Sequence, residues 1–217
     1  RKSKSYLDSL DNKANRFGVG NLFFGYTFSK SYHRNYFQIK PLLTTFIFNT
    51  VQGWNPDLRV SYRKNFDDDW LKWMRINANF NYGFSEKKFR SSFQLTYNFN
   101  RKNYAQLNLW GGTQISQYNE NEPITKTLNA IYSTFFRKNY ARFFDKTFAR
   151  IQYRREILNG VLMYSSLEYA KRKPLENYSD FSFFYKDSRD FYSNYPINGF
   201  VEDGVFEPHE SLILGLN

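Results

Sequence analysis

Residues 74–112 constrain the fold more than any other part of the chain, because apolar and polar side chains alternate along them. Residues 74–84 carry apolar or aromatic side chains on one parity and mainly asparagine on the other, and the alternation returns at 93–99 and 105–110. Such alternation predicts β-strands, and the polar turns between the runs predict antiparallel pairing. We therefore expect three consecutive strands with one shared apolar face, the third ending at Gly111-Gly112.

The first two runs also predict a hairpin register. A four-residue loop at residues 85–88 would join them. The expected pairs are Phe84 with Phe89, Phe80 with Phe93, Ala78 with Leu95 and Ile76 with Tyr97. Each apolar residue then meets another across the strands, which favours this pairing.

The length of the first strand and its polar face favour a membrane wall. Residues 74–84 match the roughly 9 to 11 residues that a tilted strand needs to cross a bilayer. Strands in soluble sheets usually have roughly 5 or 6 residues. The opposite face carries amides, hydroxyls and arginine, as in a wall between lipid and a wet lumen. A soluble sheet with one face on a core gives the same alternation, so that alternative stays open.

Strand parity assigns side chains to two expected faces. The predicted lipid-facing residues are Met74, Ile76, Phe80, Tyr82, Phe84, Phe93, Leu95, Tyr97 and Phe99. The predicted lumen-facing residues are polar or charged, namely Arg59, Arg63, Arg75, Asn77, Asn79, Gln94, Asn98, Arg150, Arg154 and Glu168. Glu168 shares its face with Arg150 and Arg154, where pairing would lower the cost of burying it.

Aromatic residues are abundant, at 21% of the chain with 18 Tyr and 24 Phe. Membrane barrels place such side chains in two girdles at the lipid–water interfaces. Two girdles would be formed by Tyr82 and Phe84 at one end of a strand, Tyr97 and Phe99 at the far end of the next, and Trp110 beyond them. No apolar run approaches the ~18 residues of a transmembrane helix.

The net charge of +11 is also typical of nucleic-acid-binding proteins. Proteins that bind single strands combine cations and aromatic rings on one surface. Here the cations concentrate in turns and on polar strand faces, while the aromatic residues of the strands mostly lie on the opposite faces. We therefore expect no nucleic-acid partner. A soluble all-β module that binds glycans or nucleic acid remains the alternative function.

Residues 123–144 predict a helical insertion between the strands. Apolar side chains recur there at three- and four-residue steps, the spacing of an amphipathic helix. Such an insertion can cover a barrel end, lie on the membrane surface or dock a protein partner. Ile131, Phe135 and Tyr140 are the docking candidates.

The remaining segments predict shorter elements. They are a helix at 5–14, a strand at 22–28, an extended run at 36–50 broken by Pro41, and a long loop at 171–210 in which only 181–185 is strand-like. The alternation of Leu212, Leu214 and Leu216 stops at Asn217 without a partner strand. We read the chain as a piece of a longer protein.

Motifs for catalysis or cofactor binding are absent, including the nucleophile elbow, the phosphate loop and the dinucleotide fingerprint. The chain has no Cys and 2 His, so we expect neither an enzyme nor a cofactor. Asp67, Asp68 and Asp69 are weak candidates for a hard cation, but their spacing is not that of a calcium loop. A solvated acidic turn is the expected reading.

Seven short stretches carry a family resemblance. They are YLDSL at 6–10, FNTVQGW at 48–54, YRKNF at 62–66, NYGFS at 81–85, FFRKNY at 135–140, LEN at 175–177 and FEPHE at 206–210. Together they resemble a family of Bacteroidota outer-membrane barrels of unassigned function that commonly carry an N-terminal carboxypeptidase-regulatory-like domain. The resemblance implies outer-membrane lipid as the surroundings, a longer parent chain and no catalytic residues.

The combined prediction is an all-β protein, an antiparallel transmembrane β-barrel of which this chain supplies about 8 to 10 strands, with a helical insertion. We expect residues 1–217 to be a fragment of one barrel domain in the cell outer membrane. The expected role is a non-enzymatic component of envelope transport, export or assembly, as a subunit that binds envelope protein partners.

Overall fold

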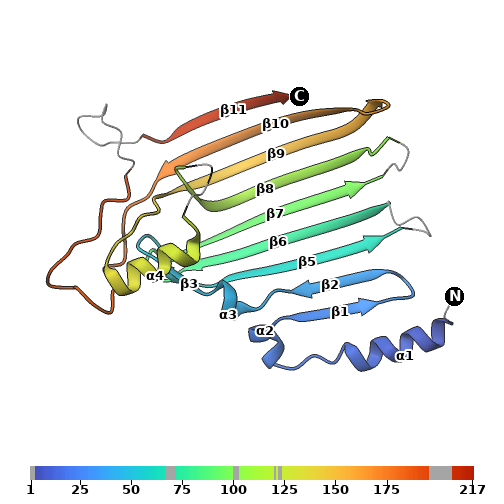
Figure 1. The fold of residues 1–217 in the computed structure, drawn as a ribbon, viewed down its shortest axis with the longest axis horizontal. Helices are drawn as coiled ribbons and strands as arrows, with labels where there is room; N and C mark the ends of the chain where they lie inside the picture. Colours follow the sequence, from blue (N-terminus) through green and yellow to red (C-terminus); the bar gives the residue numbers. More distant parts are fainter. Residues whose placement is uncertain (1–2, 67–71, 100–102, 120, 122–123, 196–206) are drawn as a thin grey trace.

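The computed structural model describes residues 3–66, 72–99, 103–119, 121, 124–195 and 207–217. The strands of its large sheet are β1 (Tyr26–Lys30), β2 (Asn35–Ile39), β5 (Asp57–Asn65), β6 (Trp73–Gly83), β7 (Lys88–Asn98), β8 (Gln106–Gln117), β9 (Phe143–Leu158), β10 (Val161–Pro174) and β11 (His209–Leu216). Within the described residues these nine strands pair antiparallel in the order β1-β2-β5-β6-β7-β8-β9-β10-β11 (Figure 1). The predicted all-β antiparallel fold is confirmed.

Short helices and one small hairpin complete the described fold. They are α1 (Lys4–Ala14), α2 (Gly20–Phe24), α3 (Leu42–Thr45), α4 (Lys126–Phe136), β3 (Ile47–Asn49) and β4 (Gly53–Asn55). The helix expected at 5–14 is confirmed. The strand expected at 22–28 is wrong over its first half, because α2 occupies residues 20–24 and β1 begins only at Tyr26. Gly25, with a φ of 92°, separates the two elements.

The buried side chain of Asp11 anchors α1 to the sheet. Its carboxylate accepts hydrogen bonds from Ser31 N at 2.6 Å, from Ser31 Oγ at 2.7 Å and from Ser29 Oγ at 3.3 Å. Burial opposes ionisation of the carboxyl, but these hydrogen bonds outweigh it and hold the pKa of Asp11 below its usual value. An ionised side chain therefore fixes the helix against the end of β1.

The large sheet is open within the described residues, because β1 pairs only with β2 and β11 only with β10. The alternating residues 212–216 do have a partner, contrary to expectation, since β11 pairs with β10 from Arg172↔His209 to Ser165↔Leu216. The loop expected at 171–210 is shorter at both ends, and residues 181–185 form no strand. β10 continues to Pro174 because its residues pair with β9 as far as Phe144, although their side chains do not alternate regularly.

The β6–β7 hairpin has the predicted faces but a different register. Ile76 pairs with Leu95, Ala78 with Phe93 and Tyr82 with Phe89. The turn covers residues 84–87, one position earlier than expected, with Lys87 in the left-handed region at a φ of 54°. Its main chain is held by hydrogen bonds from Phe84 N to Trp54 O and from Ser85 N to Gln52 O. The pairing moves by two residues in total, which keeps every side chain on its predicted face.

β8 continues through the two glycines at which we expected it to end. Gly112 has a φ of 124°, and a Cβ there would lie 2.2 Å from Ser91 O. Only glycine permits β7 and β8 to approach so closely at this point. β8 then pairs with β9 as far as Gln117↔Phe143. Gly112 is therefore a close-approach position inside a long strand.

One face of the sheet is apolar from edge to edge. Its central row of paired positions reads Phe28, Phe37, Tyr62, Ile76, Leu95, Leu109, Ile151, Leu167 and Leu214. From β6 to β11 this row is purely aliphatic. Aromatic residues lie on either side of it, Tyr97 and Tyr153 toward one end of the strands and Phe93, Tyr169, Phe80 and Phe89 toward the other.

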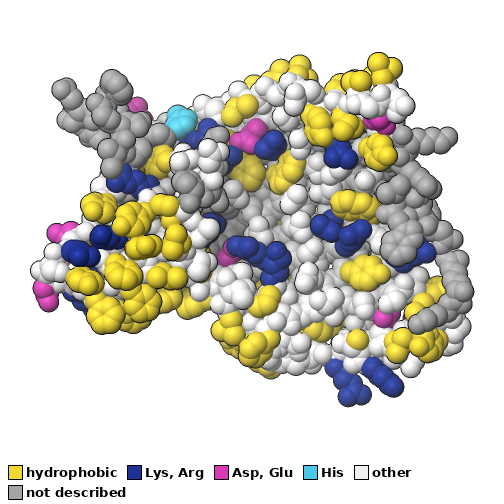
Figure 2. All heavy atoms as spheres, viewed as in Figure 1, with side chains coloured by type: hydrophobic (Ala, Val, Ile, Leu, Met, Phe, Trp, Pro, Cys, Tyr) yellow, Lys and Arg dark blue, Asp and Glu magenta, His cyan; other side chains and the backbone are white. Residues whose placement is uncertain are grey.

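The opposite face is polar and hollowed. One of its rows reads Thr27, Gln38, Ser61, Asn77, Gln94, Trp110, Arg150, Glu168 and Ile213. Two hollows of about 580 and 340 Å³ lie on this face. Figure 2 views the molecule from this side and shows Lys and Arg side chains gathered over the middle of the sheet. The sheet thus carries its polar side chains on the hollowed face and its apolar ones on the opposite face.

The main cluster of buried apolar residues lies at one end of the sheet. It consists of Val51, Ile115, Ala141, Phe143 and Leu175. We call the segments around it the end cap, namely β3, β4, α4 and residues 50–52, 137–142 and 175–195 (left in Figure 1). Its fully buried side chains include the amides Gln52, Asn55, Asn129, Asn139 and Asn194. Hydrogen bonds therefore stabilise the end cap together with apolar packing.

Candidate functional site

The larger hollow on the polar face collects most of the predicted lumen-facing residues. It is lined by Arg59, Arg63, Arg75, Asn77, Asn79 and Gln94, together with Gln38 and Lys40. Asn77 Nδ2 donates to Gln94 Oε1 at 3.2 Å, and Asn79 Nδ2 donates to Ser92 Oγ at 3.4 Å. The described lining contains four cations and no carboxylate. The hollow is therefore basic and rich in amide groups.

Two of these arginines face each other. Arg63 on β5 and Arg75 on β6 are direct cross-strand partners. The guanidinium carbons of Arg63 and Arg75 lie 5.1 and 5.4 Å from the ring centroid of Trp73. Arg63 Nε also donates to Asn65 Oδ1 at 3.0 Å. Two guanidinium groups from neighbouring strands therefore lie over the same Trp73 ring.

The smaller hollow contains the predicted pair of Arg150 and Glu168. The two are register partners on β9 and β10, and Arg150 Nη1 lies 3.8 Å from Glu168 Oε2. Lys146, which sequence reasoning missed, lies closer, with its Nζ 2.5 Å from Glu168 Oε1. Arg150 also lies over the ring of Trp110, at 5.3 Å. Trp110 is therefore a residue of the polar face, and its assignment to an aromatic girdle is wrong.

Asn98 and Arg154 lie on the same face, nearer the other end of the strands. Gln106 on β8 is the register partner of both. Arg154 pairs in register with Tyr164 and lies over its ring at 6.0 Å. The structure thus pairs Glu168 with Arg150. Arg154 lies four residues further along β9 and pairs with Tyr164 instead.

A buried ion network that the sequence did not reveal joins this face to the end cap. Arg90, with 1% of its surface exposed, binds both carboxylate oxygens of Glu86 in the β6–β7 turn. Its Nε donates to Asp145 Oδ1 at 2.7 Å, and Lys88 Nζ lies 2.5 Å from Asp145 Oδ2. The spacing of Glu86 and Arg90 around a turn was a usable signal. Asp145 is 55 residues away from Arg90 and gave none.

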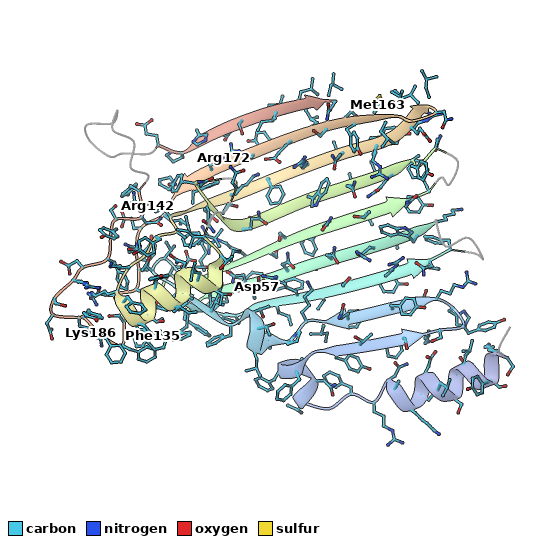
Figure 3. The ribbon with its side chains drawn as sticks, viewed as in Figure 1. Asp57, Phe135, Arg142, Met163, Arg172 and Lys186 are labelled. Carbon is cyan, nitrogen blue, oxygen red and sulfur yellow. The ribbon has the colours of Figure 1, made fainter. Side chains whose placement is uncertain are left out.

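Amide side chains continue the network. Gln52 Nε2 donates to Asn81 Oδ1 at 2.5 Å, Asn49 Nδ2 donates to Gln52 Oε1 at 3.1 Å, and Asn81 Nδ2 donates to Asn55 Oδ1 at 3.3 Å. With Arg90 they line a cavity of about 130 Å³ that α4 reaches through Lys126. Asp57, labelled in Figure 3, lines the same cavity where β5 begins.

The end cap joins stretches that carry the family resemblance. Thr50 O accepts hydrogen bonds from Tyr178 N at 3.0 Å and Ser179 N at 2.9 Å. Asn139 Nδ2 donates to Thr50 Oγ1 at 3.4 Å. The stretches 48–54 and 135–140 are therefore bonded directly, and the stretch 175–177 leads into the residues that bond Thr50. These resemblance-carrying stretches contain no catalytic motif, and they are joined by hydrogen bonds in the end cap.

α4 turns its polar residues inward. Asn129, Ser133 and Thr134 are buried, and Asn129 Oδ1 accepts a hydrogen bond from Ala141 N at 2.8 Å. The helix is shorter than the insertion expected at 123–144, because Arg137 ends it in the left-handed region at a φ of 53°. The amphipathic pattern is present, but its polar side is the one that packs.

The docking candidates therefore point outward. Ile131 and Phe135 are 46% and 44% exposed, and Tyr140 contacts the ring of Tyr132 at 5.1 Å between centroids. Phe183 and Phe184 lie 5.3 and 6.3 Å from Phe135. We call Ile131, Phe135, Phe183 and Phe184 the aromatic patch. Figure 3 labels Phe135, and Figure 2 shows apolar side chains gathered over this end of the molecule.

The predicted lipid-facing residues lie on the apolar face or at its rim. Met74, Ile76, Phe80 and Tyr82 lie on β6, Phe93, Leu95 and Tyr97 lie on β7, Phe84 follows β6 and Phe99 follows β7. Their exposure is substantial for apolar side chains, at 38% for Ile76, 50% for Phe93 and 54% for Phe84. Whatever surrounds this face therefore meets a continuous apolar surface.

The cation candidates Asp67, Asp68 and Asp69 lie outside the described residues. Among the residues that are described, no group of three or more His, Cys, Asp and Glu is arranged to hold a metal ion. No helix in the described part of the chain is long and apolar enough to cross a membrane.

Comparison with known proteins gives one match. The model of a protein family described as "Family of unknown function (DUF5686) C-terminal domain" matches residues 20–217. Searches of curated proteins and of solved structures found no match. The match covers most of the chain, and a family of unknown function is consistent with the resemblance to barrels of unassigned function. The chain therefore belongs to the DUF5686 family and carries its C-terminal domain.

Proposed function

We propose that the large sheet is part of the wall of an outer-membrane β-barrel, and that the protein is a non-enzymatic component of envelope transport, export or assembly. The observation that carries this proposal is the row structure of the apolar face. An aliphatic row from Ile76 to Leu214 lies between rows that contain aromatic residues, Tyr97 and Tyr153 on one side and Phe93 and Tyr169 on the other. Membrane barrels have this arrangement, with an apolar band between two aromatic girdles.

The dimensions of the band support the proposal. Met74↔Tyr97 and Tyr82↔Phe89 are eight residues apart along β6, which corresponds to about 26 Å at ~3.3 Å per residue. The apolar band of a membrane barrel is ~25 Å tall. Phe84 and Phe99 extend the band beyond these pairs, which offsets the tilt of the strands.

The two open edges also support closure into a barrel. Edge strands expose unpaired main-chain groups that attract other chains, and proteins cover or pair them. Leu212, Leu214 and Leu216 on the edge strand β11 are 71%, 71% and 74% exposed. In the proposed barrel, β1 and β11 pair with further strands and these leucines contact lipid.

The end cap supports membership in a larger complex. In the proposed barrel it lies over one mouth, where Asn129 Oδ1, Ser133 Oγ and Thr134 Oγ1 on the inward side of α4 form hydrogen bonds. The aromatic patch is left for an envelope protein subunit, because its four side chains are 44–58% exposed and an exposed apolar patch of this kind is typical of a protein interface.

The test places one charge on each face of the same strand. Ile151→Arg lies in the aliphatic row and should cost about 2–4 kcal/mol at the bilayer midplane. Gln152→Arg is the matched control on the polar face. We expect the intact parent protein to fractionate with the outer membrane and to show heat-modifiable gel migration, with only Ile151→Arg losing both. A monodisperse protein without detergent, or equal behaviour of the two variants, would overturn the proposal.

A soluble all-β module for glycans is the second candidate, and the amide-rich basic hollow favours it. In that case a protein layer would have to cover the apolar face. The module would then be monodisperse without detergent. Ile151→Arg would destabilise it equally with and without lipid.

A further inference from the structure

The pair formed by Arg63 and Arg75 lacks the compensation that other cations of the polar face have. Arg59 binds Asp57 at 2.5 Å, and Lys146 binds Glu168 at 2.5 Å. Within the described part of the chain, no carboxylate lies within salt-bridge distance of Arg63 or Arg75. Like charges directly opposite each other on neighbouring strands destabilise a sheet. Among the described residues, the charge of this pair is therefore uncompensated.

Trp73 orients both guanidinium groups and leaves their hydrogen-bond donors available. A guanidinium above an aromatic face is attracted by the ring and keeps its in-plane N–H groups directed outward. Arg63 uses only its Nε, toward Asn65. Neither arginine gives its terminal nitrogens to an acceptor in the described residues. Two positioned forks of this kind match the oxygens of a phosphate or carboxylate.

The surroundings of the pair suit a polar ligand of sugar size. The hollow has a volume of about 580 Å³, within the usual ~300–1,000 Å³ of small-molecule sites. Its other polar groups include Gln38, Asn77, Asn79 and Gln94. Amide side chains both donate and accept, so they can bind hydroxyl groups.

We propose that Arg63 and Arg75 form an oxyanion-binding site for the phosphate or carboxylate group of an anionic carbohydrate held in this hollow. The bound oxyanion bridges the two guanidinium groups and removes their repulsion, while Lys40 adds positive charge to the hollow. The site depends on the polar face alone. Its presence is therefore independent of whether the apolar face contacts lipid.

The binding test uses the full chain in mild detergent and titration calorimetry at low salt. The probes are glucose 6-phosphate, glucuronate and uncharged glucose. We expect one or both anionic sugars to bind and glucose to bind at least tenfold more weakly, and the preferred anion identifies the group. Equal affinity for all three sugars, or no binding of any of them at millimolar concentration, would overturn the proposal.

The variants Arg63→Gln and Arg75→Gln should each weaken binding of the anionic sugar at least tenfold. Arg155→Gln, an equal change of charge at an exposed position of β9, should leave it unchanged. Without ligand, both hollow variants should unfold at the same temperature as the unmodified chain or higher, because a like-charge contact is lost. An equal loss of affinity in Arg155→Gln would show that binding depends only on the net charge of the protein, and would reject the site.

The chain itself contains carboxylates that could compete with a ligand for the two arginines. Asp67, Asp68 and Asp69 follow Arg63 closely and lie outside the described residues. If their carboxylates neutralise the pair, replacing all three by Asn should create anion binding that the unmodified chain lacks. That result would overturn the proposal, whereas similar binding before and after the replacement supports it.

Discussion

Arg90 Nε donates to Asp145 Oδ1 at 2.7 Å and so joins β7 to β9 across β8. Both side chains are almost fully buried, and Glu86 binds the other side of the same guanidinium. The β6–β7 turn, β7 and the long strand β9 therefore share one ionic contact. With the main-chain hydrogen bonds of Phe84 and Ser85, this contact holds the turn at residues 84–87.

Removal of Asp145 should therefore be costly. Asp145→Asn leaves Arg90 with one carboxylate, and breaking a buried ion pair typically costs about 3–5 kcal/mol of unfolding free energy. Chemical denaturation of the detergent-solubilised chain measures this loss. Lys88→Gln is the control, because Lys88 is 45% exposed and its pair with Asp145 should be worth less than about 1 kcal/mol. Equal losses in the two variants would contradict this assignment.

The end cap should depend on Asn194. Its Nδ2 donates to Phe143 O and Leu175 O, both at 2.6 Å, and its Oδ1 accepts from Phe143 N at 2.8 Å. Asn194→Ala leaves these buried groups without partners, at about 1–3 kcal/mol for each. Hydrogen exchange should show faster opening of residues 175–195. Ser193→Ala, a change next to it at an exposed position, removes only the acceptor of Tyr195 N and should leave the exchange rates of the other residues unchanged.

Gly112 should tolerate no side chain. Gly112→Ala brings a Cβ to 2.2 Å from Ser91 O and 2.7 Å from Ser92 Cα in a left-handed conformation, so β7 and β8 must separate there. The expected loss is about 2 kcal/mol or more, read from the denaturation midpoint. Gly111→Ala is the neighbouring control, because the nearest atom to its Cβ is Phe148 O at 3.4 Å. A smaller loss at position 112 than at 111 would refute the close approach.

The docking of α1 should depend on pH through Asp11. Hydrogen bonds from Ser31 and Ser29 lower the pKa of Asp11 in the folded chain, so the contribution is present above the unfolded value of ~3.9. It is lost as the pH falls through the lower, folded pKa. Limited proteolysis should release α1 in acid and spare it at neutral pH. Asp11→Asn should release α1 at both pH values. Equal proteolysis of the unmodified chain in acid and at neutral pH would contradict an ionised anchor.

The outward side of α4 should govern partner binding and not folding. Phe135→Ser and Ile131→Ser change side chains that are about half exposed, so each should lower the unfolding free energy by only about 1–1.5 kcal/mol and leave the chain folded. Purification of the intact parent in mild detergent should show co-purifying envelope proteins that both variants lose. Thr127→Ser, at an exposed position of the same helix, is the control. Deletion of the whole insertion is a poorer test, because it removes the buried Ala141 and Phe143.

The local sequence pattern was enough to assign side chains to a face wherever the two faces of a strand differ in polarity. The assignment of Met74, Ile76 and Phe80 to one face and of Arg75, Asn77 and Asn79 to the other follows from a period of two, which holds in any register that moves by an even number of residues. The same reasoning predicted the antiparallel sheet and the amphipathic character of α4.

Tertiary structure decided what depends on distant partners. The hairpin register, the passage of β8 through Gly112 and the pairing of β11 all rest on contacts with other strands. The direction in which α4 faces rests on Ala141 and Phe183, whose main-chain groups bond its polar side. A sequence pattern reports which residues share a face, because that is set by backbone geometry. It does not report what covers the face, because that is set by residues far away in the chain.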